Sequence, residues 1–230
     1  MTNSESRYTF DVIGIVHSPF KEKFAIPRQP GLTNTPAIIE LVPPYAVADA
    51  VKGLEAFSHI WISFVFHGVT DREWKPLVRP PRLGGNEKLG VFATRSTHRP
   101  NPIGLSVVTL EKIDVSDGVK LHVRGVDLLD GTPVLDIKPY LPYVDSVADA
   151  CSGFAPDKPQ RLTVRWQPDA LAVAEKTSKE FRAMVEDVLA YDPRPAYQDE
   201  PERVYGVRLG DVNVRFRVGK DEIEIVDIND

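Results

Sequence analysis

A loop between residues 91 and 106, with the sequence VFATRSTHRPNPIGLS, concentrates side chains that bind anions. Two arginines supply fixed positive charge, two neutral side chains supply further hydrogen-bond donors, and two prolines restrict the backbone. These residues are Arg95, Arg99, Ser96, Asn101, Pro100 and Pro102. Hydrogen bonds from a guanidinium group are strongest when a carboxylate or phosphate oxygen accepts them. The sequence therefore predicts a rigid loop that holds an anionic ligand.

Two further stretches place polar groups in apolar or proline-rich surroundings. In VDLLDGTPVLDIKPYLPY, residues 126–143, the period of a strand puts Asp136 and Lys138 on one face beside Val134. That pair forms either an internal ion pair or the polar wall of a pocket. In AIPRQPG, residues 25–31, a proline-rich loop presents Arg28 and Gln29. The occurrence of all three stretches in one chain favours a binding site.

Other common kinds of site are disfavoured. His59 and His67 share one face of an alternating strand, but eight steps of ~3.3 Å separate them by roughly 26 Å. With five histidines, one cysteine and no HExxH or CxxC spacing, a metal site is disfavoured. The chain has no G-x-S-x-G elbow, and Cys151 has no basic neighbour and is interpreted as inert. The absence of G-x-G-x-x-G and P-loop patterns argues against a Rossmann or P-loop nucleotide site.

Charge is distributed unevenly along the chain. The net charge is −5, yet residues 72–104 carry seven Lys/Arg against two Glu. A local basic surface on an acidic protein suits an anionic ligand, although a solvated basic loop balanced by acids elsewhere explains the count equally well. No apolar run approaches the ~20 residues that cross a bilayer, and no secretory signal is visible. With a single cysteine, these features favour a cytoplasmic protein.

The elements that must position these groups are mostly strands. Alternating patterns predict strands over residues 9–16, 37–42, 59–66, 90–94, 103–113, 120–127, 134–137 and 161–166. Strands joined by irregular proline-rich loops suggest an antiparallel barrel or sandwich, and residues 45–53 predict one short helix.

The pattern changes after Pro168. Thr177 and Glu180 have the spacing of a capping box, and an apolar stripe at helical spacing follows as far as Leu189. Residues 204–209 and 212–218 flank Gly210 and Asp211, a hairpin-turn signal, and residues 223–226 could add a strand. We expect a small helix-plus-hairpin domain over residues 167–230, after a first domain over residues 1–166.

Six stretches together resemble the TrmO-type tRNA N6-methyltransferases, also called the YaeB/VirR-like family. They are KEKFAIPRQPGL, GLEAFSHIWISFVFH, VRPPRLGGN, GVFATRSTHRPNPIG, DLLDGTPVLDIKPYLPY and DPRPAY, spread over both halves of the chain. The resemblance implies a β-rich α+β protein whose N-terminal antiparallel β-barrel binds S-adenosylmethionine, without a Rossmann or knotted methyltransferase fold. It also implies a homodimer with the cofactor near the subunit interface.

The resemblance also implies a reaction and a set of site residues. The reaction is methylation of N6 of threonylcarbamoyladenosine, next to the anticodon of tRNAs that decode ANN codons. The implied cofactor contacts are Pro27, Arg28, Gln29, His67, Gly68, Arg95, Leu105, Leu129, Asp130, Gly131 and Thr132. Gly68 stands where some relatives carry a side-chain amide, so its contact can only be through the main chain. We expect Ser96, Arg99, Asn101 and Lys138 to bind the substrate.

Methyl transfer from a sulfonium depends mostly on positioning, because the leaving group is neutral. The attacking nitrogen must still lose a proton. Asp136 is the candidate acceptor and Tyr140 the second, although water could serve. The alternative function is a non-catalytic module of the same fold that senses S-adenosylmethionine or binds RNA.

Overall fold

The computed structural model describes residues 8–71, 73–83, 87–194, 200 and 202–229. Arg72 of the basic segment therefore lies outside the described residues, as do residues 84–86 and 195–197 of two stretches that carry the family resemblance.

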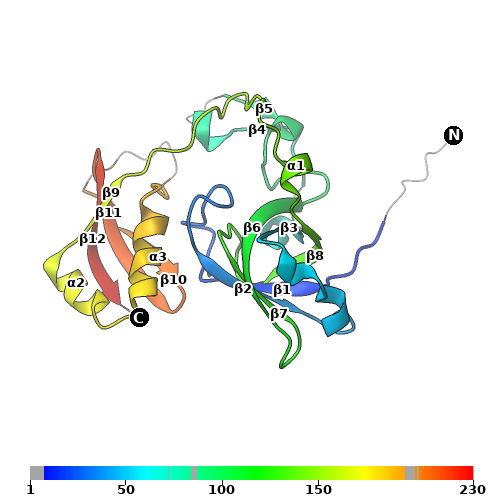
Figure 1. Ribbon diagram of the computed structural model, residues 1–230. Helices are drawn as coiled ribbons and strands as arrows, with labels where there is room; N and C mark the ends of the chain where they lie inside the picture. The colour runs from blue at the N-terminus through cyan, green and yellow to red at the C-terminus, as the bar shows by residue number, and fades with distance from the viewer. Residues whose placement is uncertain (1–7, 72, 84–86, 195–199, 201, 230) are drawn as a thin grey trace.

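Six antiparallel strands close into a barrel in the N-terminal part of the chain (Figure 1). They are β1 (Gly14–His17), β2 (Pro36–Leu41), β3 (His59–Val65), β6 (Ile103–Asp114), β7 (Lys120–Arg124) and β8 (Thr132–Pro139). Their order around the barrel is β1-β2-β7-β6-β3-β8. The predicted antiparallel barrel is confirmed.

Strand β3 shows why these residues form a barrel wall. Ile60 and Ile62 are fully buried and Phe64 is 4% exposed, whereas the residues between them are only partly buried. This alternation follows from side chains pointing to opposite faces of a strand. The inward face joins a core that runs through all six strands.

A β-bulge in β8 changes which of its side chains face the core. Val134 pairs with the inward-facing Phe64, but Asp136 pairs with the outward-facing Ser63, so Leu135 is the extra residue. A bulge shifts the alternation of one strand relative to its partner. Asp136 therefore does not share a face with Val134, contrary to the sequence-based expectation.

Two predicted elements differ in the structure. The expected strand over residues 90–94 is the end of a two-residue strand, β5 (Leu89–Gly90), followed by a 3₁₀ turn, η5 (Val91–Ala93). Both the backbone N–H and the hydroxyl of Thr94 donate to the carbonyl of Val91, which closes that turn. The expected helix over residues 45–53 is only one 3₁₀ turn, η1 (Ala48–Val51).

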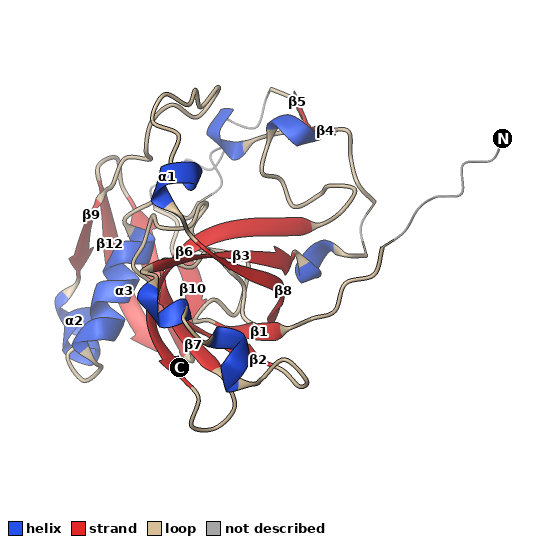
Figure 2. Cartoon of the chain, turned by 45° about the vertical axis from the view of Figure 1, so that its right-hand side comes forward, coloured by secondary structure: helices blue, strands red, loops and turns tan. Residues whose placement is uncertain are grey.

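The remaining short elements of this half surround the barrel (Figure 2). They are η2 (Leu54–Ala56), η3 (His67–Val69), β4 (Leu77–Val78), η4 (Pro81–Leu83) and α1 (Pro142–Asp145). Strand β4 pairs with β5, and this small ribbon lies away from the barrel wall.

The C-terminal part forms a four-stranded sheet with two helices. The sheet has the order β10-β11-β12-β9, and its elements are β9 (Thr163–Trp166), β10 (Tyr205–Leu209), β11 (Val212–Val218), β12 (Glu222–Asn229), α2 (Pro168–Ala174) and α3 (Lys179–Leu189). The hairpin at Gly210 and Asp211 and its third strand are confirmed. Strand β9 pairs in parallel with β12, so it belongs to this sheet and not to the barrel region in which it was predicted. The division into domains at residue 166 stays a prediction.

Helix α3 begins one residue later than the capping-box pattern predicts. The hydroxyl of Ser178, and not that of Thr177, accepts the backbone N–H of Phe181 at 3.0 Å. The hydroxyl of Thr177 instead donates to the carbonyl of Ala174 at 2.7 Å, at the end of α2. The pattern does not predict α2, which begins with Pro168 at its first position.

The loop between β1 and β2 connects the barrel to the C-terminal sheet. Phe20 forms an isolated bridge with Leu209, and the ring of Phe24 stacks on that of Phe216 with centroids 6.4 Å apart. The backbone N–H of Asn34 donates to the carboxylate of Asp187. The C-terminal part therefore holds the loop that contains Arg28 and Gln29.

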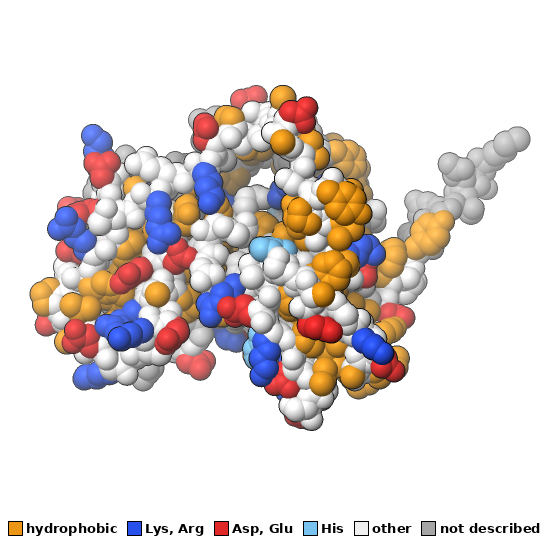
Figure 3. All heavy atoms as spheres, viewed as in Figure 1, with side chains coloured by type: hydrophobic (Ala, Val, Ile, Leu, Met, Phe, Trp, Pro, Cys, Tyr) orange, Lys and Arg blue, Asp and Glu red, His pale blue; other side chains and the backbone are white. Residues whose placement is uncertain are grey.

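Hydrophobic side chains also reach the surface, and many gather around α1 (Figure 3). Tyr143 is 84% exposed and Val144 is 58% exposed. In the described part of the chain, no helix combines the length and the apolar character needed to cross a membrane.

Candidate active site

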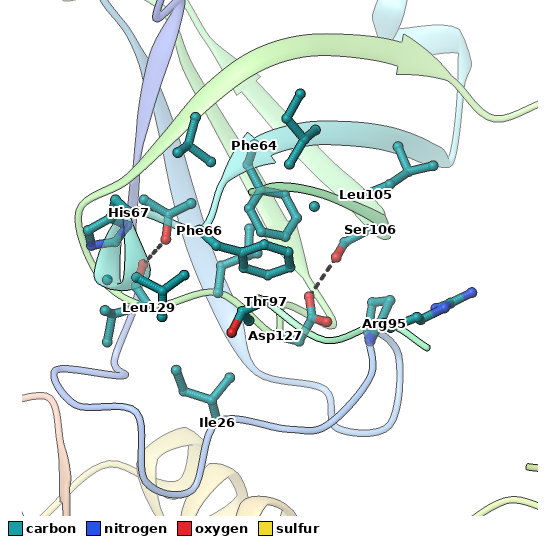
Figure 4. Close-up of a pocket in the computed structure, with 18 of the residues that line it drawn as sticks. Ile26, Phe64, Phe66, His67, Arg95, Thr97, Leu105, Ser106, Asp127 and Leu129 are labelled. Atoms are coloured by element: carbon teal, nitrogen blue, oxygen red, sulfur yellow. Dashed lines mark hydrogen bonds between the residues drawn. The ribbon is translucent and has the colours of Figure 1, made fainter. Parts of the chain in front are cut away.

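A pocket of about 510 Å³ opens at one end of the barrel (Figure 4). Four segments distant in sequence form its walls: the loop containing residues 26–30, the end of β3 with η3, the loop after η5 with the start of β6, and residues 127–132. The pairing of Val65 with Ile103 brings the ends of β3 and β6 together. The N–H of Phe66 donates to the carbonyl of Pro102, which attaches the loop over residues 91–106 to this end.

Two aromatic rings occupy the middle of the pocket wall. Phe64 and Phe66 meet edge to face, with centroids 5.1 Å apart. Leu105 and Leu129 add aliphatic surface. Gly104 lies against Phe64 so closely that a Cβ atom there would come within 2.2 Å of the ring. These groups offer a flat, apolar surface suited to an aromatic ligand.

Four cationic side chains line the pocket, and each donates to a neutral oxygen. Lys23 donates to the carbonyl of Gly68 at 2.6 Å, and Arg28 donates to that of Arg194 at 2.8 Å. Arg95 donates to the amide oxygen of Gln29 at 2.5 Å. Arg99 donates to the carbonyls of Thr94 and Ser96 at 3.1 and 3.2 Å. Because these partners are neutral, the pocket keeps a positive charge that can attract anions.

Asp127 is the one acidic residue of the pocket lining within the described part of the chain. Its carboxylate accepts a hydrogen bond of 2.7 Å from the hydroxyl of Ser106, which is 1% exposed. Burial raises the pKa of Asp127 to about 6, although the bond from Ser106 and the charge of Arg95 act against the rise. Figure 4 shows Asp127 and Ser106 on one side of the two rings, and His67 and Leu129 on the other.

The structure brings together most of the residues that the sequence predicts for the site. The predicted cofactor residues that line the pocket are Pro27, Arg28, Gln29, His67, Gly68, Arg95, Leu105, Leu129 and Thr132, and Arg99 lines it among the predicted substrate residues. Their roles stay predictions, but their positions are those of one site.

Two of the predicted cofactor residues lie beside the pocket and not in its lining. The carboxylate of Asp130 accepts from the N–H of Ser18 at 2.9 Å and from Lys21 at 2.7 Å. Gly131 has a positive φ of 75°, a conformation that favours glycine, and its N–H donates to the carbonyl of Val16. Both residues fix the turn that presents Leu129 and Thr132.

Ser96 and Asn101 lie in the loop over residues 91–106, outside the pocket lining. The hydroxyl of Ser96 accepts the N–H of His98 at 3.3 Å, and the carbonyl of Asn101 accepts that of Ile103 at 2.7 Å. In the structure these contacts shape the loop.

The three remaining candidates also lie outside the pocket lining, near the opposite edge of β3. Asp136 and Lys138 form an ion pair of 2.5 Å, and their side chains are 46% and 68% exposed. The ion pair therefore lies on the surface and is not internal, and it forms no part of the pocket wall. Neither of the two expected arrangements is found. Tyr140 packs its ring near those of His59 and Trp61.

Sequence reasoning missed several pocket residues. They are Lys23, Ile26, Trp61, Phe64, Phe66, Thr97, Gly104, Ser106 and Asp127. Phe64 lies on the apolar face of β3 and Phe66 directly follows the strand, and their place at its end is the signal that could have identified them. For Asp127 there is no comparable local signal, because its partner Ser106 comes from another strand.

The described residues contain no group of three or more His, Cys, Asp or Glu side chains that could hold a metal ion. His59 instead contacts the hydroxyls of Ser58 at 2.9 Å and Thr109 at 3.3 Å. His67 lies in η3, in the pocket wall.

Comparison with known proteins gives matches in both halves of the chain. The model of the tRNA-methyltransferase O N-terminal domain matches residues 15–146, and that of the TrmO C-terminal domain matches residues 159–230. A tRNA (adenine(37)-N6)-methyltransferase of Escherichia coli K12 is 49% identical over 228 residues, 96% of this chain and 97% of that protein.

Two further relatives add information on fold and ligand. A crystal structure of TrmO from Pseudomonas aeruginosa superposes with a TM-score of 0.82 at 41% identity, covering 98% of this chain and 99% of that one. A protein of Pyrococcus abyssi, named a probable S-adenosyl-L-methionine-binding protein, is 45% identical over 134 residues, 58% of this chain and 68% of that protein.

Proposed function

This chain belongs to the TrmO family of tRNA methyltransferases, and from that membership we propose that it methylates N6 of threonylcarbamoyladenosine, next to the anticodon of tRNAs that decode ANN codons. As an enzyme, it is an S-adenosylmethionine-dependent tRNA (adenine-N6)-methyltransferase. The observation that carries the proposed substrate is the set of four pocket cations, whose hydrogen-bond partners among the described residues are neutral oxygens.

The donor set of the pocket fits S-adenosylmethionine. Arg28 and Arg95 suit its carboxylate, and the surface of Phe64 and Phe66 suits its purine. A volume of about 510 Å³ lies within the range of small-molecule sites. When bound, the cofactor supplies a methyl group on a positively charged sulfur. The role of the chain is then to hold the two reactants in line, because positioning contributes roughly 7–11 kcal/mol to such steps.

The surplus of cations supports the modified base as the substrate. The carboxylate of the cofactor can pair with one or two guanidinium groups, those of Arg28 and Arg95. Lys23 and Arg99 then remain available for a second anion. The threonyl group of the modified adenosine carries a second carboxylate, and the tRNA backbone carries phosphates. A site built to pair a carboxylate discriminates against a ligand without one, because its donors then lose a charged partner.

We also propose that the enzyme is a cytoplasmic homodimer with the cofactor close to the subunit interface. Leu105 and Ile103 both line the pocket, yet they are 56% and 40% exposed. A second subunit would cover this apolar rim and exclude water from the pocket. Light scattering at micromolar concentration with S-adenosylmethionine present should give the mass of a dimer, and a monomer would contradict this proposal.

Radiolabelled methyl transfer to two tRNAs of one sequence tests the proposed substrate. One tRNA carries threonylcarbamoyladenosine and the other carries plain adenosine at the same position. Transfer only to the first supports the proposal, and equal rates on both would contradict it. Binding of S-adenosylmethionine without transfer to either tRNA would favour a sensor of the same fold. Mass spectrometry of tRNA nucleosides from a deletion strain gives the corresponding result in cells.

A further inference from the structure

Asp127 is the one carboxylate in the wall of the pocket among the described residues. It lies three residues after the end of β7 and is partly buried. The bond that the structure shows for its side chain comes from Ser106, a hydroxyl that is itself almost fully buried. Removing a carboxylate from water is unfavourable unless the charge is well paired. A partly buried carboxylate that lines a pocket in spite of this free-energy cost is a candidate catalytic residue.

The other carboxylates near the site, Asp130 and Asp136, each have a cationic partner. Asp130 is bound by the N–H of Ser18 and by Lys21, so it fixes a turn. Asp136 is paired with Lys138 on the outer face of the barrel. Asp127 alone among the described acids reaches the pocket.

On the premise of the proposed function, we propose that Asp127 is the catalytic residue that accepts the proton from the adenine N6 nitrogen as it is methylated. The acceptor nitrogen carries a carbonyl substituent, so its lone pair is delocalised and it is a poor nucleophile while it keeps its hydrogen. The N–H bond breaks and its proton moves to a carboxylate oxygen of Asp127. The nitrogen forms a bond to the methyl carbon, the carbon–sulfur bond breaks, and its electron pair stays on the sulfur. The proton then leaves to water through the mouth of the pocket.

The surroundings of Asp127 suit a base that works near neutral pH. A general base is most effective when its pKa is close to the working pH, and a pKa of about 6 leaves Asp127 ionised at pH 7. The charged or titratable side chains that line the pocket with it are Lys23, Arg28, His67, Arg95 and Arg99. Of these, Arg95 acts on Asp127 in the direction that favours the carboxylate.

The first test is Asp127→Asn, which keeps the shape of the side chain and removes the base. Single-turnover methyl transfer to threonylcarbamoyl tRNA should fall by about 10²- to 10⁴-fold, the usual contribution of a general base. The affinity for S-adenosylmethionine, measured by calorimetry, should stay within about threefold, because the proposed role is toward the nitrogen. The matched control is Asp117→Asn, an acid whose side chain is 97% exposed in the turn between β6 and β7. It should leave both quantities unchanged.

The second test follows the proton itself. The single-turnover rate of the wild-type enzyme should rise with pH through one ionisation, and isotope-edited NMR of the free protein should show the Asp127 carboxyl titrating over the same range, near pH 6. Ser106→Ala removes a hydrogen bond that stabilises the charged form, so it should move both midpoints to higher pH. A purely structural serine would lower the rate without moving the midpoint.

Several results would overturn the inference. A rate for Asp127→Asn near that of the wild type would do so, and so would a loss of cofactor affinity that accounts for the whole loss of rate. If Asp136→Asn, and not Asp127→Asn, removed the rise of the rate with pH, the proton acceptor would be Asp136, as the sequence suggested. If Asp127→Asn does not fold, the NMR titration of the wild type and the shift of the midpoint in Ser106→Ala test whether Asp127 is the base. A wild-type enzyme that transfers no methyl group would overturn the proposed function and the inference together, whereas an active wild type with an active Asp127→Asn overturns the inference alone.

Discussion

The guanidinium of Arg95 donates a 2.5 Å hydrogen bond to the side-chain oxygen of Gln29, 66 residues away in the sequence. This bond joins the loop over residues 91–106 to the loop between β1 and β2, which contacts the C-terminal sheet. It orients a cation whose charge remains available to a ligand. The two loops therefore act as one part of the pocket.

Replacement of Arg95 by alanine should weaken binding of S-adenosylmethionine by roughly 10- to 150-fold without unfolding the protein. The loss of a hydrogen bond from a charged group costs about 1.5–3 kcal/mol, and the exposed Arg95 contributes little to the core. Calorimetry gives the affinity, and Arg215→Ala, at an exposed ion pair in the C-terminal sheet, is the control. Unchanged affinity with normal kinetics would remove Arg95 from the site.

Replacement of Gly104 by alanine should disturb the pocket wall and the core together. Its new Cβ would lie 2.2 Å from the ring of Phe64, which is 4% exposed and has little room to move. Overpacking of this kind costs about 1–3 kcal/mol, so the melting temperature should fall by several degrees. Gly90→Ala meets no atom within 4 Å and should leave the melting temperature unchanged. Equal melting temperatures for both variants would contradict the close contact.

Replacement of Asp127 by asparagine should stabilise the protein at neutral pH. The folded state holds the pKa of Asp127 at about 6, above its ordinary value near 4, so ionisation of this residue disfavours folding. Its destabilising effect is absent below about pH 4, grows as pH rises to 6, and stays at up to about 3 kcal/mol above that. Thermal melts of both proteins from pH 4 to 8 should show a difference that grows with pH. A difference that shrinks with pH would mean that the carboxylate is stabilised in the fold.

The basic segment should give tRNA binding its dependence on salt. Lys75 and Lys88 are exposed near the small β4–β5 ribbon. If both contact phosphates, the double variant Lys75→Gln/Lys88→Gln should reduce the slope of log affinity against log salt by about 1–2, with cofactor affinity unchanged. Lys112→Gln, whose native side chain pairs with Asp114 at the far end of β6, is the control. A wild-type slope in the double variant would assign the phosphate contacts to other residues.

The sequence predicts the parts of the fold that depend on local alternation. The buried face of β3 and the hairpin at Gly210 are visible because each follows from neighbouring residues alone. The barrel, the cofactor and most of the pocket loops come from the resemblance of six stretches to a known family. That resemblance identifies Arg28, Gln29 and Arg95 as members of one site before any contact between them is known.

The features that sequence analysis misses depend on contacts between distant residues. The bulge at Leu135 turns Asp136 and Lys138 outward, and no periodic pattern reveals an extra residue in a strand. Asp127 belongs to the site because β6 places Ser106 beside it. Strand β9 joins the C-terminal sheet through β12, a partner more than fifty residues further along the chain.

The position of β12 between β11 and β9 also sets an order for folding during synthesis. All six strands of the barrel have left the ribosome once residues up to Pro139 are exposed, so the barrel can close while the rest of the chain is still being translated. Strand β9 emerges early but has no partner until Glu222–Asn229 follows. The loop that carries Arg28 and Gln29 likewise lacks its contacts with Leu209 and Phe216 until the hairpin of β10 and β11 follows. A nascent chain can therefore close its barrel before the pocket at the end of that barrel is complete.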